Sequence, residues 1–200
     1  MKRRMVHLLA AMFSLCAMVG YAGTADAGAA TDVVKSKQAA LFELLKQPGA
    51  ANQKKVNAIF DEMLDYGTLA EASLGSEWAP RSDAEKAEFS ELLKQFVRKS
   101  YERNLKKTLN FNIEYVREKS EGTAIVVATR AVSKTNAREA PIEISFKMQE
   151  KGGAWRVADI VTEDVSLVSS YRSQFTKIVK KDGFPALIMK MKDKIAKGEG

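Results

Sequence analysis

The hydrophobic period of this chain changes twice, and this limits the architectures open to it. From about residue 31 to residue 109, apolar side chains recur every three or four positions, the spacing of amphipathic helices. Between residues 113 and 162 they alternate with polar neighbours, as in half-buried strands, most clearly from Ile142 to Met148. The helical spacing returns from Ser166 onward. The order of helices, strands and helices predicts an α+β fold, with helices laid against the apolar face of a sheet.

Turn signals divide the alternating stretch into four predicted strands. Glu121-Gly122, residues 134–138 and Lys151-Gly152-Gly153 each separate two apolar runs, and the last run extends from Trp155 to Thr162. Consecutive strands with short connections favour an antiparallel meander with one solvent-exposed face and one apolar face. We therefore expect a four-stranded antiparallel sheet.

Helix boundaries can be placed from capping residues and breakers. Before the sheet, we expect helices over Thr31–Gln47, from an N-cap at Asn52, over Tyr66–Ser73, and from the capping box Ser82-Asp83-Ala84-Glu85 to about Leu109. After the sheet, a helix ends at Asp182-Gly183, and a shorter one carries Pro185 in its first turn.

The corner Glu163-Asp164 with Ser166 lies between the last strand and the following helix. It can be interpreted as a helix cap, as a pair of catalytic acids or as a patch that docks a partner. We favour a cap formed by Asp164 or Ser166, because both side chains accept hydrogen bonds from free backbone N–H groups. A catalytic pair would need a nearby base, and the sequence places none beside it.

The first residues have the pattern of a secretory signal peptide. Lys2-Arg3-Arg4 form a positive region, Met5–Val19 is mostly apolar, and Ala25-Asp26-Ala27 fits the small-x-small rule for cleavage. The apolar run is shorter than the ~20 residues of a spanning helix, which disfavours a retained membrane anchor. We predict cleavage after Ala27, a single domain over residues 28–200, and a periplasmic location.

This domain would contain neither cysteine nor histidine, because Cys16 and His7 lie in the leader. Cysteine or histidine nucleophiles, an imidazole base and the usual zinc sites are therefore excluded, and we predict no catalytic residue, metal or cofactor. Carboxylate-only chemistry stays open. The net charge of +7 favours acidic partners or anionic lipid headgroups, and nucleic acid is not expected for an exported protein.

Three segments together resemble the MlaC-like family of periplasmic phospholipid-binding proteins, also called toluene-tolerance auxiliary proteins. "WRVADIVTEDVSLVSSYRSQF" (155–175) is similar to the family signature W-[KR]-V-x-D-[VI]-x-x-x-x-V-S-L-[VI]-x-x-Y-R-x-x-F. "DYGTLAEASLGSEW" (65–78) and "SDAEKAEFSELLKQFVRKSYERNL" (82–105) resemble two further family segments, in family order. One departure is Glu163-Asp164, where a glycine often precedes V-S-L.

The resemblance implies a non-enzymatic carrier with a curved sheet, helices over its concave face, and an apolar cavity for acyl chains. It also implies partners: an inner-membrane ABC complex with an MCE-domain ring, and an outer-membrane lipoprotein associated with porins. Lipid exchange between them would maintain outer-membrane lipid asymmetry.

The apolar stripes supply candidate lipid-binding residues. On the strands these are Ile113, Tyr115, Ile142, Ile144, Phe146 and Val157. On the helices these are Leu69, Leu74, Phe89, Leu92, Phe96, Tyr101, Leu167 and Tyr171. The alternative is that they fill the core completely, and periodicity does not separate the two cases.

Other functions stay open at this point. A small cone-shaped enzyme would need a buried acid such as Asp159 with a raised pKa. A docking or scaffold protein would have a filled core, and a hopanoid-type triterpenoid is an alternative cargo for a carrier. The lysine-rich tail, residues 177–197, suggests transient contact with a membrane surface.

Overall fold

Helices and strands follow one another in the predicted α+β order. The computed structural model describes residues 28–47 and 49–198, and for residues 101–108 it describes the backbone alone. The elements before the sheet are α1 (Ala29–Lys46), α2 (Ala50–Met63), α3 (Tyr66–Leu74), η1 (Gly75–Glu77) and α4 (Asp83–Thr108). The strands are β1 (Phe111–Glu121), β2 (Ala124–Ser133), β3 (Ile142–Lys151), β4 (Ala154–Thr162) and β5 (Val165–Ser166), and the last helices are α5 (Leu167–Asp182) and α6 (Phe184–Ala196). The predicted signal peptide, residues 1–27, lies outside the described residues.

Within the described residues, the sheet is an antiparallel meander of five strands in the order β1-β2-β3-β4-β5. The prediction of four strands is therefore wrong in number. The additional strand is only two residues long and pairs with the end of β4 through Val161–Ser166 and Thr162–Val165. So short a strand carries no alternating pattern, and its residues precede a helix directly, so the sequence pattern showed only the helix.

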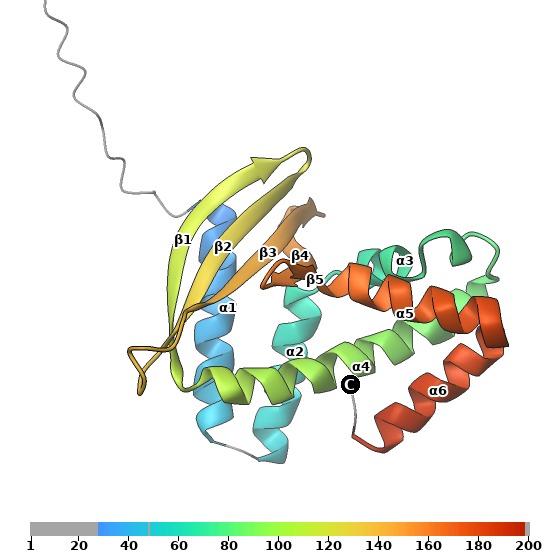
Figure 1. The fold of residues 1–200 in the computed structure, drawn as a ribbon, viewed down its shortest axis with the longest axis horizontal. Helices are drawn as coiled ribbons and strands as arrows, with labels where there is room; N and C mark the ends of the chain where they lie inside the picture. Colours follow the sequence, from blue (N-terminus) through green and yellow to red (C-terminus); the bar gives the residue numbers. More distant parts are fainter. Residues whose placement is uncertain (1–27, 48, 199–200) are drawn as a thin grey trace, which may run out of the picture.

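Cross-strand pairing aligns the side chains of the inner face, the face that contacts α1, into rows. The rows are Ile113–Ala131–Ile142, Tyr115–Thr129–Ile144, Glu118–Val127–Phe146–Ile160 and Ile125–Met148–Val157. Register shifts interrupt the pairing near Val116 in β1 and Ala158 in β4. Such bulges bend a sheet, and Figure 1 shows β1 and β2 curving along their length.

The helices fall into two groups (Figure 1). The pair α1 and α2 packs side by side, with α1 against β1, β2 and β4. The helices α3, α4, α5 and α6 pack on one another beside the sheet, and α5 contacts β4. None of the helices in the described residues combines the length and apolar composition needed to cross a membrane.

The capping box at the start of α4 is confirmed. The Ser82 N–H donates to Glu85 Oε2 at 2.8 Å, and the Glu85 N–H donates to Ser82 Oγ at 3.3 Å. The N-cap predicted at Asn52 is wrong, because α2 begins at Ala50 with Gly49 as its N-cap. Asn52 instead donates its side-chain N–H to the Gln47 carbonyl at 2.6 Å, bridging the connection between α1 and α2.

The corner after β4 separates into a turn and a cap. Ser166 is the N-cap of α5, since its Oγ accepts the Ser169 N–H at 3.0 Å, and this prediction is confirmed. Glu163 and Asp164 form the two-residue loop of the β4–β5 hairpin, and both have positive φ, 49° and 61°. A hairpin turn with two left-handed residues favours asparagine followed by glycine, so this turn is built from disfavoured residues.

Replacing Asp164 by glycine relieves this backbone strain. We expect Asp164→Gly to raise the free energy of unfolding by about 0.5–1 kcal/mol, because glycine adopts positive φ without a Cβ clash. Thermal or urea unfolding of the purified variant measures the change. The matched control is Asp193→Gly in the exposed part of α6, where the same substitution lowers stability by roughly 1 kcal/mol. A loss of stability in both variants would contradict the strained-turn interpretation.

Candidate functional site

The predicted strand residues lie together on the inner face, but helices cover them unequally. Phe146 and Val157 are fully buried, at 3% and 0% exposure. Ile113, Ile142 and Ile144 are only half-buried, although they belong to the same apolar face. The inner face therefore has a well-covered end and a partly covered end, where Ala131 and Thr129 on β2 are still fully buried. The partly covered end is where α4 leads into β1.

Tyr115 lies in the partly covered part of the face and contacts α1. Its hydroxyl donates to Gln38 Oε1 at 2.7 Å, and the Lys35 ammonium lies 5.9 Å from its ring centroid. Burial raises the pKa of Tyr115 to about 12, so the phenol stays protonated and remains a donor at neutral pH. This contact fixes α1 against β1.

The predicted helical residues are mostly buried in the group formed by α3, α4, α5 and α6. Leu69, Leu74, Phe89, Leu92, Phe96 and Tyr171 are all buried, and Leu167 is half-buried. For Tyr101 the structure describes the backbone alone, so the position of its side chain stays a prediction. Lipid contact by these residues is likewise a prediction.

Ring contacts show how densely this helical group is packed. Phe89 lies edge-on to Phe175, with centroids 5.6 Å apart, and 6.3 Å from Phe184. Tyr171 stacks on Phe175 at 5.3 Å and meets Phe96 at 5.7 Å. Such pairs add stability beyond burial alone. Around Phe89, the side chains thus pack as an aromatic core.

A hollow of about 400 Å³ lies at the partly covered end of the sheet. Its lining consists of Ala39, Phe42, Glu43, Lys46, Leu109 and Lys134. This volume falls within the ~300–1,000 Å³ range of small-molecule sites. Sequence reasoning missed all of these residues. For the part of the lining that α1 contributes, the sequence did hold an indication. Ala39, Phe42 and Lys46 are spaced so that they lie on one side of the helix.

The rim of this hollow is charged. Lys134 Nζ donates to the Leu109 carbonyl at 2.8 Å, just beyond the end of α4. Lys46 Nζ pairs with Glu43 at 2.6 Å on α1. Ala39, Phe42 and Leu109 also line the hollow, so its lining combines apolar and charged residues.

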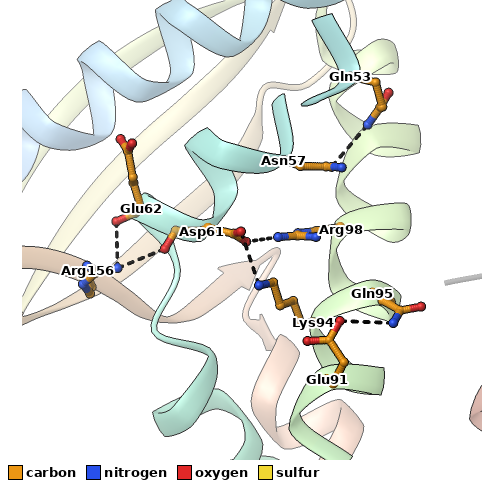
Figure 2. Close-up of polar contacts among 9 residues, drawn as sticks. All are labelled: Gln53, Asn57, Asp61, Glu62, Glu91, Lys94, Gln95, Arg98 and Arg156. Carbon is orange, nitrogen blue, oxygen red and sulfur yellow. Dashed lines mark hydrogen bonds and ion pairs between the residues drawn. The ribbon is translucent and has the colours of Figure 1, made fainter. Parts of the chain in front are cut away.

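Polar contacts between α2, α4 and β4 set where the α1–α2 pair lies (Figure 2). Asp61 on α2 pairs with Arg98 and, at 3.3 Å, with Lys94, both on α4. Arg156 on β4 donates to the carbonyls of Asp61 at 3.0 Å and Glu62 at 3.2 Å, near the end of α2. These basic groups therefore already have partners within the fold.

Asp159 has a structural role. Its Oδ1 accepts the N–H groups of Ile160 at 2.8 Å and Val168 at 3.1 Å, and its Oδ2 accepts the Ser166 hydroxyl at 2.6 Å. The carboxylate thus joins β4 to the first turn of α5. A general base would have to give up these donors, so the enzyme alternative gains no support from this residue. Within the described residues, no group of three or more acidic, cysteine or histidine side chains could hold a metal ion.

Removing the Asp159 carboxylate should unfold the junction between β4 and α5. We expect Asp159→Ala to lower the free energy of unfolding by about 2–4 kcal/mol, because the donors lose their acceptor. Asp159→Asn keeps one acceptor oxygen, so its free energy of unfolding should fall by less. Urea unfolding measures both, with Asp193→Ala on the surface of α6 as control. Equal stability of Asp159→Ala and the control would contradict this role.

A second carboxylate with a structural role is Asp65, which is buried and is the N-cap of α3. It accepts the Thr68 N–H at 3.1 Å and pairs with Lys151 at 2.9 Å, while its own N–H donates to the Val157 carbonyl at 3.0 Å. Burial raises the pKa of Asp65, but the hydrogen bonds from Lys151 and Thr68 lower it more, so its pKa lies below the ordinary value. These bonds anchor the α2–α3 junction to β4.

The lowered pKa of Asp65 predicts a pH-dependent contribution to stability. A depressed folded-state pKa stabilises the fold above the ordinary aspartate pKa of about 3.9, and this contribution is lost as the pH falls through the folded-state value. We therefore expect Asp65→Asn to be less stable than the wild type at pH 7, with a difference that shrinks below about pH 4. Urea unfolding across this range measures it, with Asp193→Asn as control. A difference that does not depend on pH would contradict the ionic role.

Comparisons with known proteins agree with the fold. The model of the family described as "MlaC protein" matches residues 29–193. The intermembrane phospholipid transport system binding protein MlaC of Haemophilus influenzae is 27% identical over 154 residues, which cover 70% of this chain and 72% of that protein.

A solved structure matches as well. The phospholipid-binding protein of Ralstonia solanacearum, determined in complex with a phospholipid, aligns with a TM-score of 0.70 at 19% identity. The alignment covers 87% of this chain and 99% of that one. At this identity the match shows a shared fold.

Proposed function

The chain belongs to the MlaC family, whose model covers residues 29–193, and from this we propose that it binds phospholipid and carries it between membranes. The family and the fold shared with a phospholipid-bound protein support binding and transport. Catalysis is not part of the proposal.

The observation that carries the proposal is the uneven cover of the inner face. Ile113, Ile142 and Ile144 are apolar and point to the side of the sheet that α1 covers, yet they are only half-buried. A hollow with apolar lining lies at the same end of the sheet. Acyl chains placed there would complete the burial of this face, with the headgroup at the charged rim.

Physical chemistry favours a carrier for such a cargo. Each methylene of a lipid exposed to water costs about 0.8 kcal/mol, so free diffusion of a phospholipid between membranes is negligible. Acyl chains are equally dry in a membrane and in an apolar cavity, so exchange lies near energetic balance. Direction then comes from the partner proteins.

The partners in this proposal are an inner-membrane ABC complex with an MCE-domain ring and an outer-membrane lipoprotein–porin complex. The H. influenzae relative is named as part of an intermembrane phospholipid transport system, which supports this setting. A periplasmic location follows from the predicted signal peptide over residues 1–27.

The lysine-rich tail could add contact with a membrane surface, but much of its charge is paired. Lys190 pairs with Asp182 at 2.6 Å, and Lys192 pairs with Glu88 at 2.6 Å. Met189 is exposed at 68% and supplies an apolar side chain between them. Transient contact of this tail with anionic headgroups therefore stays part of the proposal. Fewer of its lysines are free to make that contact than the sequence indicates.

A charge placed on the half-buried row tests lipid binding. We expect Ile113→Glu to lose most of the bound lipid, at least tenfold, because a carboxylate beside acyl chains stays unpaired in an apolar site. The measurement is native mass spectrometry of protein from the periplasm, followed by lipid extraction. The matched control is Val116→Glu on the same strand, where the side chain is already 43% exposed, and this variant should retain its lipid.

Circular dichroism and thermal unfolding must show that both variants fold, and Ile142→Glu provides a second test of the same row. A wild-type protein that carries no lipid, even after incubation with phospholipid vesicles, would overturn the carrier function and leave a docking protein. A bound triterpenoid would keep the carrier and replace its cargo.

A further inference from the structure

The first described residue lies against a carboxylate of the sheet. Helix α1 begins at Ala29, and its N-cap is Gly28, which has no side chain to cap the helix. Glu118 on β1 takes this role, since its Oε2 accepts the Thr31 N–H at 2.9 Å and the Thr31 hydroxyl at 2.6 Å. An element 87 positions away therefore caps the first turn of α1.

The other oxygen of this carboxylate faces Gly28. A Cβ added to Gly28 would lie 2.1 Å from Glu118 Oε1 and 2.7 Å from Oε2, closer than atoms can approach. The Glu118 side chain could move away, but it would then leave Thr31. Glycine at position 28 thus allows the backbone to lie in contact with the Glu118 carboxylate.

We propose that Glu118 binds the protein's own mature amino terminus. Hydrolysis of the Ala27–Gly28 bond by a signal peptidase consumes one water and leaves a carboxylate on Ala27 and an amine on Gly28. At neutral pH this amine takes up a proton and becomes an ammonium. The new charge forms on the residue that lies against Glu118, so processing completes the cap of α1 with an ion pair.

The charges around Gly28 favour this pair. Glu118 comes from β1, and Asp32 lies in the first turn of α1. Lys35, one turn further, lies over the Tyr115 ring, and Arg117 and Lys119 alternate with Glu118 and belong to the opposite face of β1. A cation at a helix N-terminus is unfavourable, so the ammonium depends on the Glu118 carboxylate.

The direct test is the pKa of the α-amine in the mature protein. Reductive methylation with ¹³C labels this amine, and NMR separates it from the lysines while the pH is varied. We expect a pKa above the ordinary 7.7–8.0, because the carboxylate favours the charged form. Glu118→Gln should return it to the ordinary range, whereas Glu121→Gln, the same charge change on the same strand, should leave it raised.

A stability measurement complements the titration. A raised folded-state pKa stabilises the fold below the ordinary α-amine pKa, and this contribution is lost as the pH rises through the folded-state value. The chain that starts at Gly28 should therefore have a higher Tm at pH 6 than one that starts at Ala27. This difference in Tm should become smaller as the pH rises to 10. The Ala27 chain has the same Glu118 and Thr31 side chains but carries its ammonium one residue away from Gly28, so this comparison tests the position of the charge.

Two results would overturn the proposal. One is an α-amine pKa that is the same in the wild type and in Glu118→Gln. The other is an intact mass of the periplasmic protein that corresponds to a first residue other than Gly28. Neither outcome depends on whether the protein carries lipid.

Discussion

The proposed function depends on a sheet whose apolar inner face is buried unevenly. At one end, Val157 and Phe146 are buried, whereas Ile113 and Ile144 at the other end are only half-buried. Covering the remaining apolar area would add hydrophobic stabilisation. In the proposed function, a cargo would complete the burial of these side chains. An acyl chain fits, since it needs apolar contact and no directional bonds.

A space for acyl chains beside the sheet would persist only if the surrounding helices and strands are held in place. Asp65 anchors the junction of α2 and α3 to β4, and Asp159 anchors the start of α5 to the same strand. Asp61 fixes α2 to α4 through ion pairs (Figure 2). These carboxylates position helices and strands through hydrogen bonds and ion pairs. The amino end of α1 is held in the same manner by Glu118.

The features that could be predicted from the sequence are those that depend on interactions between residues close together in the chain. Periodicity identified the helices and the main strands, and the Ser82–Glu85 box and the Ser166 cap were correct because short-range hydrogen bonds define them. The strand β5 and the left-handed turn at Glu163 needed tertiary pairing, and the cap at Asn52 failed because the helix began earlier. The hollow could not be predicted, because it depends on how α1 packs against Leu109, just after α4, and Lys134, just after β2. An apolar stripe in the sequence also looks the same whether it lines a core or a cavity.

The central claim is that acyl chains lie against the partly covered end of the sheet. Methyl NMR of the isoleucine-labelled protein, loaded with a phospholipid that carries a spin label near the end of one acyl chain, measures this directly. We predict strong broadening of the methyl signals of Ile113, Ile142 and Ile144, with little effect on Ile59 and Ile188, which lie on α2 and α6. Equal broadening at all sites, or broadening of surface methyls alone, would contradict the account.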